Sequence, residues 1–91
     1  GICTSDDKQR AQFIHAHLAQ IARAMSEGIP VLGYLHWSLL DNYEWHEGFT
    51  PRFGLVEVDY PTQERRVRSS ARYLASVAKA GRLVTVNGMA E

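Results

Sequence analysis

The 91-residue chain is 45 % hydrophobic and 22 % charged, which is typical of a folded globular protein and excludes disordered, collagen-like and low-complexity classes. Ten basic and ten acidic residues leave no net charge, so we expect no nucleic acid partner and no attraction to an anionic membrane. The single cysteine, Cys3, cannot form an internal disulfide, and no Cys/His spacing is typical of zinc. We therefore expect no metal, no cofactor and a reducing, cytoplasmic location. The longest apolar run, residues 29–35, is too short for a membrane helix.

The first third of the chain predicts a helix followed by a buried strand. Apolar residues recur at helical spacing from residue 5 to residue 26, with polar capping residues at 5–7 and Gly28 in place for a left-handed C-cap. Pro30 prevents the helix from continuing. Residues 31–37 form a short, mostly apolar run, which predicts a parallel strand covered on both faces.

The rest of the chain predicts a long loop and short elements. Residues 38–52 have no periodicity but contain three aromatic residues and a histidine, so we expect an ordered, functional loop. The remaining predicted elements are an extended piece at 54–60 ended by Pro61, a helix capped by Ser69 or Ser70 that runs to Ala80 and is closed by Gly81, a weak strand at 83–86 and a turn at Asn87–Gly88.

This alternation predicts an α/β fold that is incomplete on its own. A strand buried on both faces needs neighbours along both edges, because each unpaired buried backbone group costs about 1–3 kcal/mol. The sequence supplies one such strand, and no predicted sheet is wide enough to cover the apolar stripes of two helices. We therefore interpret residues 1–91 as one segment of a larger domain.

The loop after the predicted strand carries the residues best suited to bind a ligand, because ligands collect at the carboxyl ends of parallel strands. Trp37 and Trp45 flank Glu44 and the polar pair at residues 41–42. An indole ring can cover the C–H face of a sugar, and a carboxylate can accept hydrogen bonds from two neighbouring hydroxyls. The pattern favours a neutral, polyhydroxylated ligand. The alternative is that both tryptophans are core aromatics and Glu44 is a solvated loop acid.

The loop and its flanks resemble the C-terminal end of family 1 glycoside hydrolases, the β-glucosidase and β-glycosidase family. The similarity runs from Gly1 to about Ala80. The residues that carry it are Trp37-Ser38-Leu39-Leu40-Asp41-Asn42-Tyr43-Glu44-Trp45, Gly48-Phe49, Arg52-Phe53-Gly54-Leu55-Val56, Val58-Asp59-Tyr60, Thr62-Gln63, Arg65-Arg66 and Ser69-Ser70-Ala71.

The resemblance implies a (β/α)8 TIM barrel that hydrolyses terminal β-glycosides with retention, using two glutamates. The chain would then be the C-terminal quarter of a single barrel domain, with its two helices as barrel helices 7 and 8 and residues 31–37 as strand 8. Gly1 fits the glycine of the family's Glu-Asn-Gly motif, so the nucleophile would lie two residues before it. The Asn-Glu-Pro motif of the acid/base does not occur. No catalytic residue is therefore expected in this chain.

The same resemblance assigns substrate-binding roles to four residues. Glu44 would accept hydrogen bonds from the 4- and 6-hydroxyls of the nonreducing sugar, and the Trp45 indole N–H would reach the 3-hydroxyl. Trp37 would form the platform under the ring, and Phe53 would close the pocket. A carboxylate at Glu44 repels phosphate, so we expect an unphosphorylated sugar.

The other titratable residues have simpler interpretations. His15 and His17 lie on different sides of a helix and cannot bind one metal ion. His36 is interpreted as a packing residue, and His46 as a solvated loop residue. The basic cluster of Arg65, Arg66, Arg68 and Arg72 is interpreted as a solvated or intramolecularly paired surface.

Two hypotheses follow for the whole chain. In the first, it is part of a β-glucosidase-type hydrolase, inactive alone, that binds a β-glycoside or monosaccharide together with the N-terminal remainder of the barrel. In the second, it is a separately folding or engineered barrel fragment, or a carbohydrate-binding module without activity, which assembles with itself or with a complementary piece.

Overall fold

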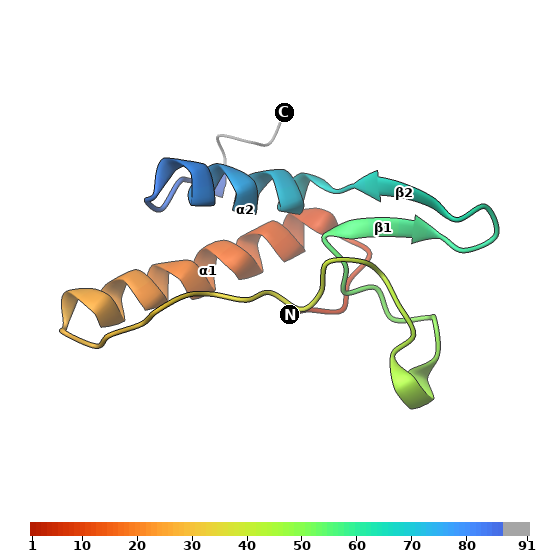
Figure 1. Ribbon diagram of the computed structural model, residues 1–91, viewed down its shortest axis with the longest axis horizontal. Coiled ribbons are helices and arrows are strands. Elements are labelled where there is room, and N and C mark those ends of the chain that lie inside the picture. Colours follow the sequence, from red (N-terminus) through yellow and green to blue (C-terminus); the bar gives the residue numbers. More distant parts are fainter. Residues whose placement is uncertain (87–91) are drawn as a thin grey trace.

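The computed structural model describes residues 1–86 and shows two helices, one 3-10 turn and one short hairpin (Figure 1). In chain order these are helix α1 (Asp7–Ser26), the 3-10 turn η1 (Trp45–Glu47), strand β1 (Val56–Asp59), strand β2 (Glu64–Val67) and helix α2 (Ser69–Ala80). None of the helices within residues 1–86 has the length and apolar character that crossing a bilayer requires. The predicted turn at Asn87–Gly88 lies outside the described residues.

Helix α1 confirms the first predicted helix, although it begins two residues later than the predicted start. Asp6 is its N-cap, and the Asp6 side chain accepts a hydrogen bond of 3.1 Å from the Lys8 backbone N–H. Gly28 follows the helix with a φ of 89°, a conformation that costs glycine little because it has no Cβ. The local capping signals therefore fix both ends of this helix.

Helix α2 confirms the second predicted helix but not its predicted N-cap. The N-cap position is Arg68, which makes no capping side-chain bond. The cap comes instead from Asp7 of α1, whose carboxylate accepts hydrogen bonds of 2.7 Å from both the backbone N–H and the hydroxyl of Ser70. Gly81 closes the helix at φ 69°, as predicted. The prediction of a Ser69 or Ser70 cap was wrong because a carboxylate from a neighbouring helix occupies that place.

The two helices lie side by side and enclose a small core (Figure 1). Ile14 of α1 and Tyr73 of α2 are fully buried there, and Leu55 from the segment before β1 is buried against them. The Tyr73 hydroxyl donates to the Val84 carbonyl at 2.6 Å and lies 2.7 Å from His15 Nδ1. This contact holds the segment after α2 against the helices.

Residues 31–37 do not form the predicted buried strand. The segment runs alongside α1 (Figure 1), but no strand pairs with it within residues 1–86, and Leu32 and Leu35 are 99 % and 98 % exposed. A strand requires a hydrogen-bonding neighbour. Among the described residues the one isolated bridge joins Leu40, which lies beyond the segment, to Val56 in parallel. The described chain is only 18 Å thick along its shortest dimension. The described chain can therefore cover one face of residues 31–37, whereas their apolar pattern predicts a strand that is covered on both faces.

Strands β1 and β2 form an antiparallel hairpin with Val56 opposite Val67 and Asp59 opposite Glu64. Strand β1 confirms the predicted extended piece, whereas β2 was not predicted because its residues are exposed and highly charged. The predicted strand at 83–86 is wrong: these residues form no strand, because no partner lies beside them in the described chain.

Candidate functional site

The structure brings together two of the four predicted binding residues. The Trp37 indole N–H donates a hydrogen bond of 3.1 Å to Glu44 Oε2, across seven positions of sequence. Trp37 is 55 % exposed, so the pair lies at the surface and not in the core. An indole surface and a carboxylate therefore stand next to each other, with the second carboxylate oxygen available for a ligand hydroxyl.

Trp45 follows directly but faces solvent on its own. The chain turns sharply after Glu44, whose backbone N–H donates to the Gly48 carbonyl at 2.8 Å, and η1 lies within this turn. Trp45 is 82 % exposed, and within residues 1–86 no protein group accepts a hydrogen bond from its indole N–H. Both tryptophans are therefore exposed in the described chain.

Phe53 is tied to the same region through its backbone. Its carbonyl accepts a hydrogen bond of 3.1 Å from the Ser38 N–H, and Leu55 N–H donates to the Ser38 carbonyl at 2.8 Å. These bonds place the half-buried Phe53 next to the residue that follows Trp37. They do not join the Phe53 ring to Glu44 or Trp45.

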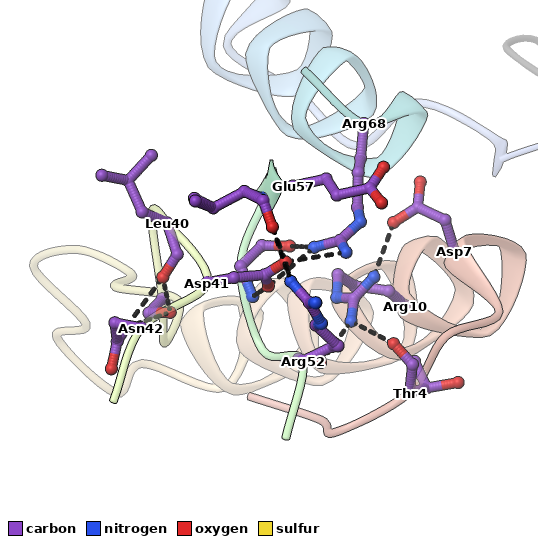
Figure 2. Close-up of polar contacts among 12 residues, drawn as sticks. Thr4, Asp7, Arg10, Leu40, Asp41, Asn42, Arg52, Glu57 and Arg68 are labelled. Atoms are coloured by element: carbon purple, nitrogen blue, oxygen red, sulfur yellow. Dashed lines mark hydrogen bonds and ion pairs between the residues drawn. The ribbon is translucent and has the colours of Figure 1, made fainter. Parts of the chain in front are cut away.

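Beneath the loop lies a buried charge cluster centred on Asp41 (Figure 2). The Asp41 side chain has no exposed surface and accepts hydrogen bonds of 2.9 Å from Gly54 N–H and 3.3 Å from Val58 N–H. Its oxygens also accept from Arg52 Nη1 at 2.9 Å and from Arg68 Nη1 and Nη2, each at 3.0 Å. A single carboxylate thus joins the loop to β1 and to the start of α2.

Burial by itself would raise the pKa of Asp41, but the hydrogen bonds from Arg68, Gly54 and Arg52 outweigh it and hold the pKa below its ordinary value of 3.8. The carboxylate is therefore ionised at neutral pH. The sequence interpretation noted Asp41 only as part of a polar pair, because its partners lie 11 to 27 positions away. No local pattern could have identified them.

A second network in Figure 2 connects the N-terminal segment to the loop. Arg10 is fully buried, pairs with Asp7 at 2.8 Å, and donates to the carbonyls of Thr4 and Arg52, each at 2.6 Å. The Thr4 N–H also donates to the Arg52 carbonyl at 3.1 Å. The segment before α1 and the end of the loop are therefore held together.

An open hollow of about 560 Å³ lies next to the loop but contains none of the four predicted binding residues. Its lining includes Tyr43, Phe49 and Tyr60. The Phe49 ring packs at a tilt against Tyr43 and edge-on against Tyr60, with centroid separations of 5.3 and 4.8 Å. Arg52 lies over the Tyr60 ring at 4.7 Å. These ring contacts pack the loop residues Tyr43 and Phe49 against Tyr60.

The remaining predicted residues have the simpler roles expected for them. His36 packs edge-on against Phe13 with ring centroids 6.4 Å apart, and burial lowers the pKa of His36. The His46 side chain is 88 % exposed. Arg66 pairs with Glu57 and Asp59 across the hairpin and with Glu64 on its own strand, and Arg68 pairs with Asp41, which confirms the paired interpretation for these two arginines.

Comparisons with known proteins agree on one family. Residues 3–82 match Glycosyl hydrolase family 1. Beta-glucosidase A of Thermotoga maritima is 48 % identical over 73 residues, which are 80 % of this chain and 16 % of that protein. A beta-galactosidase of Saccharolobus solfataricus is 47 % identical over 81 residues, 89 % of this chain and 17 % of that protein. The chain therefore belongs to glycosyl hydrolase family 1, as its loop motif predicted.

The solved structures support the same assignment. A beta-glycosidase from Pyrococcus horikoshii superposes with a TM-score of 0.90 at 50 % identity, covering 93 % of this chain and 20 % of that one. Beta-glucosidase from Thermotoga maritima in complex with glucoimidazole superposes with a TM-score of 0.78 at 46 % identity, covering 80 % of this chain and 17 % of that one. These relatives are TIM-barrel glycoside hydrolases. The present chain spans about one fifth of their length or less.

Proposed function

We propose that this chain is the C-terminal part of a retaining β-glucosidase-type barrel and supplies the loop that binds the nonreducing sugar. The observation that carries the proposal is the exposed pairing of the Trp37 indole with the Glu44 carboxylate. In the family-based assignment Trp37 lies under the sugar ring, Glu44 accepts from two hydroxyls, Trp45 donates through its indole N–H and Phe53 closes the pocket. A site built to pair hydroxyls discriminates strongly against sugars that lack them.

In this proposal the chain binds and orients the sugar, and cleavage belongs to two glutamates elsewhere in the barrel. The position of Gly1 supports this division. Any side chain at Gly1 would collide with the backbone carbonyl of Trp37, so the N-terminal segment lies directly against the tryptophan. Residues preceding this segment in the longer relatives would then approach the same site. The binding energy of the sugar could be used there to distort its ring toward the transition state.

The exposed apolar segment favours an incomplete barrel over a self-contained module. Leu32 and Leu35 are almost fully exposed, and the backbone from residue 32 to residue 37 makes no strand pairing in the described chain. Covering two leucines is worth about 1.5–3 kcal/mol each. We propose that the remainder of the barrel covers them, with residues 31–37 as its eighth strand.

The proposal can be tested by a segment exchange. The matching segment of beta-glucosidase A of Thermotoga maritima is replaced by this chain, and hydrolysis of a chromogenic β-glucoside is measured. We expect turnover from the exchanged protein and a 10- to 100-fold lower kcat/KM after Glu44→Gln, because a hydrogen bond to a charged group is worth about 1.5–3 kcal/mol. The matched control is Glu47→Gln, since Glu47 is an exposed acid on the same turn. Equal losses in the two variants would contradict the assignment of Glu44.

A further inference from the structure

The loop that carries Glu44 is attached to the rest of the chain at Asp41. The backbone N–H of Asp41 donates to the Val56 carbonyl at 3.1 Å, and its carboxylate accepts from Gly54 N–H and Val58 N–H. Both the main chain and the side chain of Asp41 are therefore attached to β1, and the side chain also to Gly54 just before it. No other residue of the loop combines a fully buried carboxylate with main-chain bonds of this kind within residues 1–86.

Only two residues separate Asp41 from Glu44. Each residue of chain spans at most about 3.3–3.6 Å, so the position of Asp41 limits where the Glu44 backbone can lie. The chain from Ser38 to Asn42 is tightened as well, because the Asn42 side-chain amide donates to the Leu40 carbonyl at 2.7 Å and to Ser38 Oγ at 3.2 Å. Glu44 then reaches back to Trp37, which precedes Ser38. Asp41 lies between Trp37 and Glu44 in the sequence, so the geometry of this pair depends on the position of Asp41.

Asp41 holds the loop through charge interactions as well as through its bonds to the main chain. One carboxylate faces two guanidinium groups, whose side chains are 32 % exposed in Arg52 and 11 % exposed in Arg68. Neutralising Asp41 would leave two cations close together under the loop with no counter-ion from the cluster. Their repulsion would separate the segments that Asp41 now joins.

We propose that Asp41 is the positioning residue of the sugar site: by holding Arg52, Arg68 and the N–H groups of Gly54 and Val58, it sets the geometry in which Glu44 meets Trp37. The consequence for sugar affinity rests on the function proposed above. The consequence for the Trp37–Glu44 contact does not, because it concerns only contacts within this chain.

The contact can be observed directly because the chain has only two tryptophans. In a heteronuclear NMR spectrum of the 91-residue chain each indole N–H gives one signal, and Trp45→Phe assigns them. Glu44→Gln defines the position that the Trp37 signal adopts when its charged acceptor is lost. We expect Asp41→Asn to move the Trp37 signal toward that position.

The matched control is Tyr73→Phe, which removes partly buried hydrogen bonds between α2 and residues outside the loop. It should lower stability while leaving the Trp37 indole signal in place. If Asp41→Asn leaves the signal in place as well, the proposal is overturned. Coincident indole signals in the unmodified chain would also overturn it, because there would be no ordered pair to position.

If Asp41→Asn does not fold, Arg68→Lys provides the test, because lysine keeps the charge but cannot donate the paired hydrogen bonds. A smaller displacement of the Trp37 signal supports the proposal, and no displacement contradicts it. In the exchanged enzyme, Asp41→Asn should raise KM at least 10-fold and lower kcat less. Failure of the unmodified exchanged enzyme to hydrolyse glucosides, with the indole signals behaving as expected, would refute the proposed function and leave the positioning role standing.

Discussion

Asp7 offers the sharpest test of how this chain holds its two helices together. Its carboxylate accepts two hydrogen bonds of 2.7 Å from Ser70 at the start of α2 and pairs with the fully buried Arg10. Losing a helix cap costs about 1 kcal/mol, and removing one partner of a buried ion pair costs about 3–5 kcal/mol. Arg10 keeps its bonds to Thr4 and Arg52, which reduces the second cost. We expect Asp7→Ala to lower the free energy of unfolding by about 3 kcal/mol.

The neighbouring acid provides the control. Asp6 caps α1 by accepting one exposed hydrogen bond from Lys8 N–H, so Asp6→Ala should cost only about 1 kcal/mol. Both variants are measured in urea titrations of the 91-residue chain, followed by far-ultraviolet circular dichroism. A loss for Asp7→Ala no larger than that for Asp6→Ala would refute the reasoning that a cross-helix cap couples α1 to α2.

The same carboxylate should make the difference between wild type and Asp7→Ala depend on pH. Burial by itself would raise the pKa of Asp7, but hydrogen bonds from Ser70 and Arg10, together with the Arg10 charge, hold it below 3.8. A group whose pKa is lowered in the folded state contributes stability above its unfolded pKa and loses it as the pH falls through the folded pKa. The stability difference should therefore be constant from neutral pH down to about pH 5 and shrink in stronger acid.

Three further substitutions test separate features of the fold. Gly81→Ala should cost about 1 kcal/mol in urea titrations because Gly81 has a φ of 69°, whereas Gly33→Ala, with open space around it and no positive φ, should be nearly neutral. Ile14→Ala should cost about 2–5 kcal/mol because Ile14 is fully buried, and a smaller loss would show that this core is loosely packed. Arg66→Ala should cost less than about 1 kcal/mol despite its three acidic partners, because these pairs are exposed to solvent. A loss above 2 kcal/mol would contradict the surface assignment of this cluster.

The sequence by itself determined the parts of this protein that depend on neighbours along the chain. Both helices and their glycine ends follow from apolar spacing and capping residues, because a helix bonds each residue to one four positions away. The loop motif around Glu44 identified the family for the same reason: its residues are contiguous and can be read without a structure. Strand β2 was missed since its exposed, charged residues carry no apolar alternation.

Only the tertiary structure decided which groups meet across long separations. It showed that Asp7, and not a serine, caps α2, and that Asp41 binds two arginines and two backbone N–H groups beneath the loop. It also showed that residues 31–37 have no strand partner among residues 1–86, although their apolar pattern is that of a strand. A carboxylate can accept from any donor that the fold brings near, and a strand exists only when another lies beside it. These outcomes depend on the arrangement of the whole molecule in space.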